Sequence, residues 1–61
     1  MYEFSKEILR KVSFDRQLFK KELVKALRSL KSEEKILLKA WCLATFGHMY
    51  QDVIVEVFRL N

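Results

Sequence analysis

The stretch that decides the predicted fold is Ile36–Phe46, ILLKAWCLATF. When it is wound as an α-helix, at about 100° per residue, apolar side chains point in nearly every direction. Lys39 and Thr45 are its only polar residues. A helix that is apolar nearly all round must be covered on nearly all sides, and this one is too short for a bilayer, which needs about 20 apolar residues. We therefore expect other helices, or another copy of the chain, to surround it.

The ends of this central helix carry residues with helix-terminal preferences. Ser32 is the predicted N-cap, because its hydroxyl can accept a hydrogen bond from a free backbone N–H of the first turn. Glu33 and Glu34 follow at the positive end of the helix dipole. Gly47, the only glycine in the chain, is predicted to adopt a left-handed conformation and to end the helix.

The length and composition of the chain favour self-association. A chain of 61 residues forms one domain at most, spanning 1–61, and buries only about 60% of its unfolded surface. Small domains are usually stabilised by disulfides, metals or oligomerisation. One cysteine cannot form an internal disulfide, and no Cys and His cluster offers a structural zinc site. Because 51% of the residues are hydrophobic, too many for so small an interior, oligomerisation is the predicted stabiliser.

The N-terminal segment, residues 2–12, is predicted to form a short amphipathic helix. Phe4, Ile8 and Val12 follow one another at four-residue spacing and form the predicted apolar edge, which Leu9 widens. The lysine, arginine and glutamate side chains between them point away from this edge. We therefore expect this helix to pack on the others through Phe4, Ile8 and Val12.

A second helix is predicted over residues 16–30. Its apolar stripe has helical spacing, and Asp15 is the predicted N-cap. With Asp15 as the cap, Phe14 and Phe19 have the spacing of a hydrophobic staple, which would fix how the chain enters the helix.

The last segment, residues 49–60, is predicted to be a helix with one apolar face. Residues 53–58 are rich in β-branched side chains, so a strand that pairs with its copy across a dimer is the alternative. The connections between the predicted helices are short, which favours antiparallel neighbours. The predicted fold is all-α: a small bundle of three to four short antiparallel helices around the nearly all-apolar central helix, about residues 36–46.

The residues that could carry chemistry do not form a convincing site. His48, Asp52 and Glu56 would share one edge of a helix and could ligate a metal or tune a base, but pairing of His48 with Asp52 explains them more simply. Cys42 has apolar neighbours and is predicted to be a buried structural thiol. A single glycine excludes a glycine-rich phosphate loop. We predict no catalytic residue, no metal site and no cofactor, and therefore no enzymatic activity.

The aromatic residues around Gly47 suggest where the chain would make contacts. Trp41, Phe46 and Tyr50 could form a ligand cage or a base-stacking platform, although aromatic side chains at this spacing are more typical of a core. The leading hypothesis is a small non-enzymatic interaction or regulatory protein that acts as a homo-oligomer, with a dimer as the first choice. Large aromatic side chains usually dominate such interfaces. The candidate interface residues are Trp41, Phe46, Tyr50, Val53, Val57 and Phe58.

The alternative hypothesis is a nucleic-acid-associated module. The net charge is +4, and residues 13–31 alone contain six basic and two acidic residues. A basic face attracts phosphates, although it can equally keep a sticky small protein in solution. The last helix is largely apolar and carries two acidic residues, so it does not suit the recognition helix of a helix-turn-helix motif. The candidate phosphate-binding face is Lys20, Lys21, Lys25, Arg28 and Lys31.

The N-terminal residues also bear on location. Charged residues follow Met1 where the apolar core of a signal peptide would lie, and a lone apolar-flanked cysteine is typical of a reducing compartment. We therefore expect a cytoplasmic protein, and we do not expect a membrane to be its partner.

Overall fold

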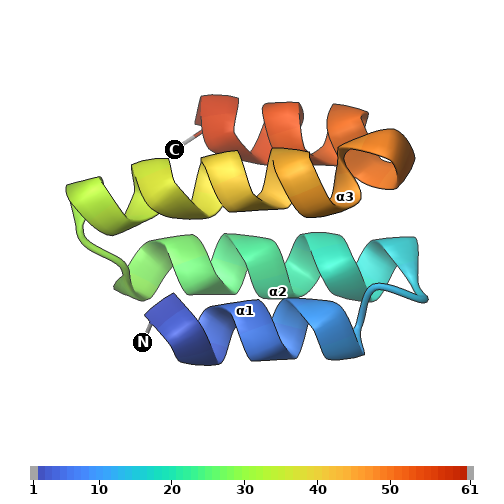
Figure 1. Cartoon of the computed structure of the whole chain (residues 1–61), viewed down its shortest axis with the longest axis horizontal. Helices are drawn as coiled ribbons and strands as arrows, with labels where there is room; N and C mark the ends of the chain where they lie inside the picture. Colours follow the sequence, from blue (N-terminus) through green and yellow to red (C-terminus); the bar gives the residue numbers. More distant parts are fainter. Residues whose placement is uncertain (1, 61) are drawn as a thin grey trace.

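The computed structural model describes residues 2–60, with the side chain of Leu60 excepted, and its secondary structure is all-helical, as predicted. Three helices follow one another: α1 (Tyr2–Lys11), α2 (Arg16–Ser29) and α3 (Ser32–Leu60) (Figure 1). No strand occurs within residues 2–60, so the strand alternative for residues 53–58 is wrong. Val53, Ile54 and Val57 are buried on one face of a helix instead, whereas Val55 is exposed.

The longest helix, α3, contains a kink at Tyr50, where φ is −127° and ψ is 28°. Figure 1 shows the chain doubling back at this kink, and Ile36 and Phe58, one on each side of it, line the same hollow. The predicted helix end at Gly47 is therefore wrong. Gly47 lies inside the helix without a positive φ, and nothing lies within 4 Å of the position that its Cβ would occupy. The reversal comes three residues later, at Tyr50, whose side chain is buried.

At the start of α2 the predicted N-cap, Asp15, is confirmed, but the predicted hydrophobic staple between Phe14 and Phe19 is not formed. The Asp15 carboxylate accepts hydrogen bonds from the backbone N–H groups of Gln17, at 2.9 Å, and Leu18, at 3.1 Å. Phe14 is 79% exposed, so it does not supply the packed half of a staple. Phe19 is buried under aromatic rings of α3, which take the place that the staple prediction gave to Phe14.

The start of α3 differs from the prediction by one residue. The carbonyl of Lys31 accepts the first helical hydrogen bond, from the N–H of Lys35 at 2.9 Å. The Glu34 carboxylate reaches back and accepts from the Lys31 N–H at 3.0 Å. This is the glutamate half of a capping box, and it makes Lys31 the N-cap in place of Ser32.

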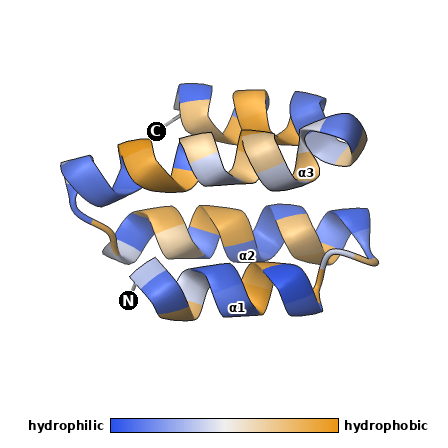
Figure 2. Cartoon of the chain, viewed as in Figure 1, coloured by the Kyte–Doolittle hydropathy of each residue, from blue (hydrophilic) through white to orange (hydrophobic). Residues whose placement is uncertain are grey.

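The core lies between α2 and the other two helices. Helix α2 packs against both α1 and α3. Hydrophobic residues are more continuous along α3 than along the mainly hydrophilic α1 (Figure 2). In α1 the buried positions are Ser5 and Leu9, so the helix is turned relative to the predicted edge and Phe4 is left outside. The buried hydrophobic side chains are Leu9, Phe19, Leu23, Leu27, Leu30, Leu38, Cys42, Phe46, Tyr50, Val53, Ile54 and Val57.

The surface area shows that the helices pack tightly. The accessible area is 4215 Å². A compact chain of 7.4 kDa should expose about 4200 Å². Apolar side chains that remain exposed therefore reflect where the sequence places them and do not result from loose packing. Within residues 2–60, no helix combines the length and the apolarity needed to cross a bilayer.

Candidate interaction surfaces

Four of the six predicted interface residues lie in the core of the chain itself. Because α3 reverses at Tyr50, the residues after the kink pack back against the rest of the chain. Four of the predicted interface residues are buried by this packing. They cannot contact a partner while the chain keeps this conformation. The buried four are Phe46, Tyr50, Val53 and Val57, whereas Trp41 and Phe58 are half-buried and reach the surface.

The aromatic residues near the kink pack on one another. Tyr50 stacks on Phe19 with a centroid distance of 4.6 Å, and Phe46 meets Phe19 edge-on at 5.1 Å. The Tyr50 hydroxyl donates a hydrogen bond to the carbonyl of Ser13, at 2.6 Å, in the connection between α1 and α2. The core interpretation of Phe46 and Tyr50 is thus confirmed, because their rings fill space and do not frame an open cage.

The Trp41 ring lies beneath two basic side chains of α1, Lys6 and Arg10. The Lys6 ammonium lies 5.7 Å from the centroid of the indole ring, and the Arg10 guanidinium lies 5.4 Å from it. Cations at these distances are attracted to the ring face. Trp41 also meets Phe46 edge-on at 5.5 Å, so it links α1 to the core while part of the side chain stays accessible.

One side of the predicted central helix is open. Ile36 is 70% exposed and Leu37 is 55% exposed, and Ala40 and Ala44 are exposed further along the same helix. Positions 36, 40 and 44 lie along one line of a helix, because residues four apart are neighbours on its surface. The chain alone therefore does not cover this segment on all sides, contrary to one of the two predicted possibilities. We call Ile36, Leu37, Ala40 and Ala44 the α3 face.

The two remaining candidate residues border the α3 face. Trp41 follows Leu37 by one turn, and Phe58 lines a hollow together with Ile36. Ser32, Lys35 and Lys39 complete the lining of that hollow. The α3 face is thus an uncharged strip with an aromatic side chain close to each long edge.

A second surface lies on the outer side of α2. Lys21, Lys25 and Arg28, here called the basic stripe, are exposed, and no ion pair is found for them within the described part of the chain. Lys20, a fourth member of the predicted phosphate-binding face, lies 3.4 Å from a Glu56 carboxylate oxygen. Lys31 is exposed in the connection between α2 and α3, directly before α3. A shallow hollow runs along this side, lined by Gln17, Lys20, Lys21, Val24, Lys25 and Arg28.

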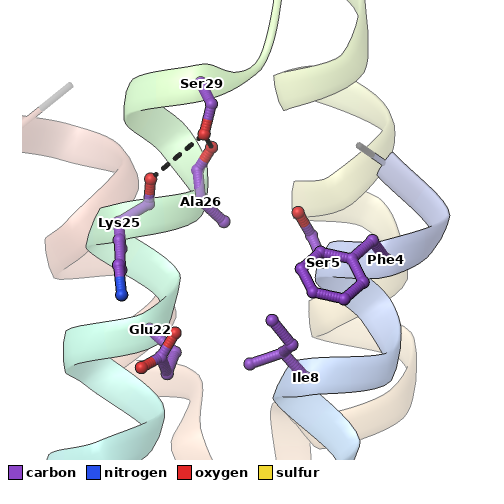
Figure 3. Close-up of a pocket in the computed structure, with 7 residues that line it drawn as sticks. All are labelled: Phe4, Ser5, Ile8, Glu22, Lys25, Ala26 and Ser29. Carbon is purple, nitrogen blue, oxygen red and sulfur yellow. Dashed lines mark hydrogen bonds between the residues drawn. The ribbon is translucent and has the colours of Figure 1, made fainter.

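A third surface is a groove between α1 and α2, here called the α1–α2 groove. Figure 3 shows Phe4 and Ile8 extending from α1 towards α2, with Lys25 and Glu22 on the opposite wall. The groove has a volume of about 150 Å³. Its lining residues are Phe4, Ser5, Ile8, Glu22, Lys25, Ala26 and Ser29.

The predicted acidic edge near His48 is used for ion pairs with α2. Asp52 receives a forked hydrogen bond from the Arg16 guanidinium in place of the predicted pairing with His48. This hydrogen bond lowers the pKa of Asp52. Glu56 pairs with Lys20. No group of three His, Cys, Asp or Glu side chains that could hold a metal occurs in residues 2–60.

The lone cysteine is buried, as predicted. Cys42 has no exposed surface, and this burial raises the pKa of its thiol to about 12. A thiol with this pKa stays protonated at neutral pH, and the thiolate is the reactive form. Cys42 therefore serves as a small apolar side chain of the core.

In comparisons with protein-family models, curated proteins and solved structures, nothing matches this chain. Function is therefore inferred from the three surfaces just described. The periodicity of residues 2–12 could not have indicated the α1–α2 groove, because it assigned Phe4 and Ile8 to the packed edge.

Proposed function

We propose that this protein is a small, non-enzymatic cytoplasmic protein that acts through protein–protein interaction, as a homodimer formed through the α3 face. One observation carries the proposal: Ile36, at 70%, and Leu37, at 55%, are exposed side by side in a chain that is otherwise tightly packed. Exposed contiguous apolar patches usually mark interaction sites. Burying Ile36 and Leu37 in a dimer would also reduce the exposed apolar surface that we expect from a chain with 51% hydrophobic residues.

The order of large and small side chains on the α3 face supports a second copy as the occupant. The large Ile36 and Leu37 lie near the start of α3, and the small Ala40 and Ala44 follow. In a two-fold dimer with the two α3 helices antiparallel, Ile36 of one copy packs on Ala44 of the other, and Ala40 lies near the axis. A parallel arrangement would oppose Ile36 to its own copy and leave a gap at Ala44, which close packing disfavours.

The area that a stable interface needs indicates that Trp41 and Phe58, at the two edges of the α3 face, also take part. A standard interface buries about 800 Å² on each partner. That is about a fifth of the 4215 Å² that the chain exposes. The four residues of the α3 face do not supply this area alone, so the proposed interface extends over Trp41 and Phe58. Both belong to the anchors predicted from the sequence, and the other four anchors are replaced by Ile36, Leu37, Ala40 and Ala44.

The antiparallel arrangement of the helical segments belongs to the same proposal. It is supported by the short connections on either side of α2 and by the reversal of α3 at Tyr50. In this arrangement the basic stripe and the α1–α2 groove share no residue with the α3 face, so both stay available to other molecules.

The test compares Ile36→Glu with Phe14→Glu by analytical ultracentrifugation over a wide dilution range. Full burial of an isoleucine is worth about 1.5–3 kcal/mol, and a symmetric dimer loses two copies. Since 70% of Ile36 is open to be buried, the dimer should weaken by about 2–4 kcal/mol, which is more than tenfold in Kd. The added charge weakens it further.

Phe14→Glu is the matched control. It removes a large apolar side chain that is also mostly exposed, at 79%, and adds the same charge, but in the connection between α1 and α2. We expect its sedimentation to equal that of the unmodified chain, with helicity by circular dichroism unchanged in both variants. Equal dissociation of the two variants, or none in Ile36→Glu, would contradict the proposal.

A further inference from the structure

The α1–α2 groove has the size and the lining of a pocket for one apolar side chain. Phe4 is 59% exposed, and Ile8 and Ala26 are half-buried, so apolar surface lies open between the two helices (Figure 3). A space of about 150 Å³ can hold a molecule the size of benzene. The groove therefore has room for one leucine or phenylalanine side chain from outside.

The basic stripe adjoins this groove. Lys25 lines both the groove and the hollow on the outer side of α2, and Lys21 and Arg28 lie about one turn before and after it. Seven residues of helix extend over roughly 10 Å, so the three cations form a row of that length. Among the described residues that line the two hollows, Glu22 is the only carboxylate.

We propose that the α1–α2 groove and the basic stripe together bind an acidic amphipathic helix of another protein. The partner inserts one large apolar side chain between α1 and α2 and places carboxylates opposite Lys21, Lys25 and Arg28. Apolar anchors at helical spacing in a groove are an established mode of peptide recognition, and complementary charge adds selectivity. The site is separate from the α3 face and does not depend on dimerisation.

The apolar groove distinguishes this partner from a nucleic acid. Phosphates would engage only the lysine and arginine side chains, and they gain nothing from an apolar pocket. The exposed Phe4, the half-buried Ile8 and the Lys25 that both hollows share favour a ligand with an apolar anchor and negative charge on one surface.

The experiment measures fluorescence anisotropy of a labelled synthetic helical peptide with leucines along one face and glutamates elsewhere. A permuted peptide of the same composition, with the leucines spread around the helix, is the ligand control. Two matched pairs of variants locate the site: Phe4→Ala against Phe14→Ala, and Lys25→Glu against Lys39→Glu. All four positions are exposed, so the fold should tolerate the changes, and circular dichroism checks this.

We expect the amphipathic peptide to bind, and Phe4→Ala and Lys25→Glu each to weaken binding by about tenfold, the effect of truncating one side chain that contributes to an interface. We expect Phe14→Ala and Lys39→Glu to bind the peptide as the unmodified chain does. The permuted peptide should bind more weakly than the amphipathic one. If Phe4→Ala loses helicity, Ala26→Gln, which fills the groove from α2, takes its place.

Three results would overturn the proposal. The first is absence of binding, and the second is equal binding of the permuted peptide or of Phe4→Ala. The third is tight binding of a single-stranded oligonucleotide or of anionic vesicles that is lost in Lys25→Glu and kept in Phe4→Ala. That result would identify a phosphate-binding surface without an apolar anchor.

Discussion

Tyr50 lies at the kink of α3 and contacts both α2 and the connection before it. Replacing it with phenylalanine tests the contribution of its hydroxyl group alone. The ring is buried and stacks on Phe19 at 4.6 Å, and the hydroxyl donates to the Ser13 carbonyl at 2.6 Å. Tyr50→Phe keeps the stacking and removes only the hydrogen bond. The half-buried Ser13 carbonyl then loses its donor from α3.

The cost of this change follows from the geometry. A typical hydrogen bond contributes about 0.5–1.5 kcal/mol net, and water can partly replace the lost donor at a half-buried carbonyl, so we expect a loss of about 1 kcal/mol. For a domain of this size that lowers Tm by about 4–8 °C. The total free energy of unfolding of 61 residues is only about 3–9 kcal/mol. Tyr50→Ala, which also removes the ring, costs about 3–5 kcal/mol, a large part of this total, and should lower Tm much further.

The assay is urea and thermal unfolding followed by far-UV circular dichroism at one fixed protein concentration, because dimerisation would make the measured stability depend on protein concentration. Tyr2→Phe is the matched control, since the contact of the Tyr2 ring with Lys6, at 4.8 Å, does not use the hydroxyl. A Tyr50→Phe variant as stable as the unmodified chain, or an equal loss in Tyr2→Phe, would refute the reasoning.

Three further predictions concern single side chains. Cys42, whose thiol pKa burial raises to about 12, should react with a thiol reagent at pH 8 far more slowly in the folded chain than in guanidinium; equal rates would mean an accessible thiol. The pKa of Asp52 is lowered by its hydrogen bond from Arg16, so the pair stabilises the fold above the ordinary carboxylate pKa and loses this effect as pH falls through the lowered value. Asp52→Asn should therefore lose less stability on acidification, measured as urea midpoints, and an unchanged pH slope would contradict this. Ala40→Cys should form a disulfide-linked dimer under mild oxidation and Ala44→Cys should not, because only position 40 approaches its own copy in the proposed two-fold; a dimer without this cross-link would reject the antiparallel geometry and leave self-association standing.

Much of the helical structure could be predicted because it depends on local chemistry. Apolar periodicity located α1 and α2 to within a residue or two, and the Asp15 side chain marked the start of α2. The position of the reversal could not be predicted. Gly47 has the local preference for a helix end, but the contacts of Tyr50 with Phe19 and Ser13 come from residues more than thirty positions away. These tertiary contacts decide where the chain turns.

The candidate surfaces were predictable only in part. The sequence shows that residues 36–46 are apolar nearly all round, but which side stays open depends on where α1 and α2 lie. Because the second part of α3 folds back, it buries Phe46, Tyr50, Val53 and Val57 and leaves Ile36 outside. The basic stripe was easier to predict, because lysine and arginine are mostly exposed and these three lie opposite the apolar stripe of the same helix.

The central claim is that the α3 face is covered by a second copy of the chain. Light scattering on a size-exclusion column, repeated over serial dilution of the unmodified protein, tests it most directly. We predict a mass of twice 7.4 kDa at high concentration that falls towards the single-chain mass on dilution. A mass of 7.4 kDa at every concentration would contradict the claim and show that Ile36 and Leu37 stay exposed in the isolated protein.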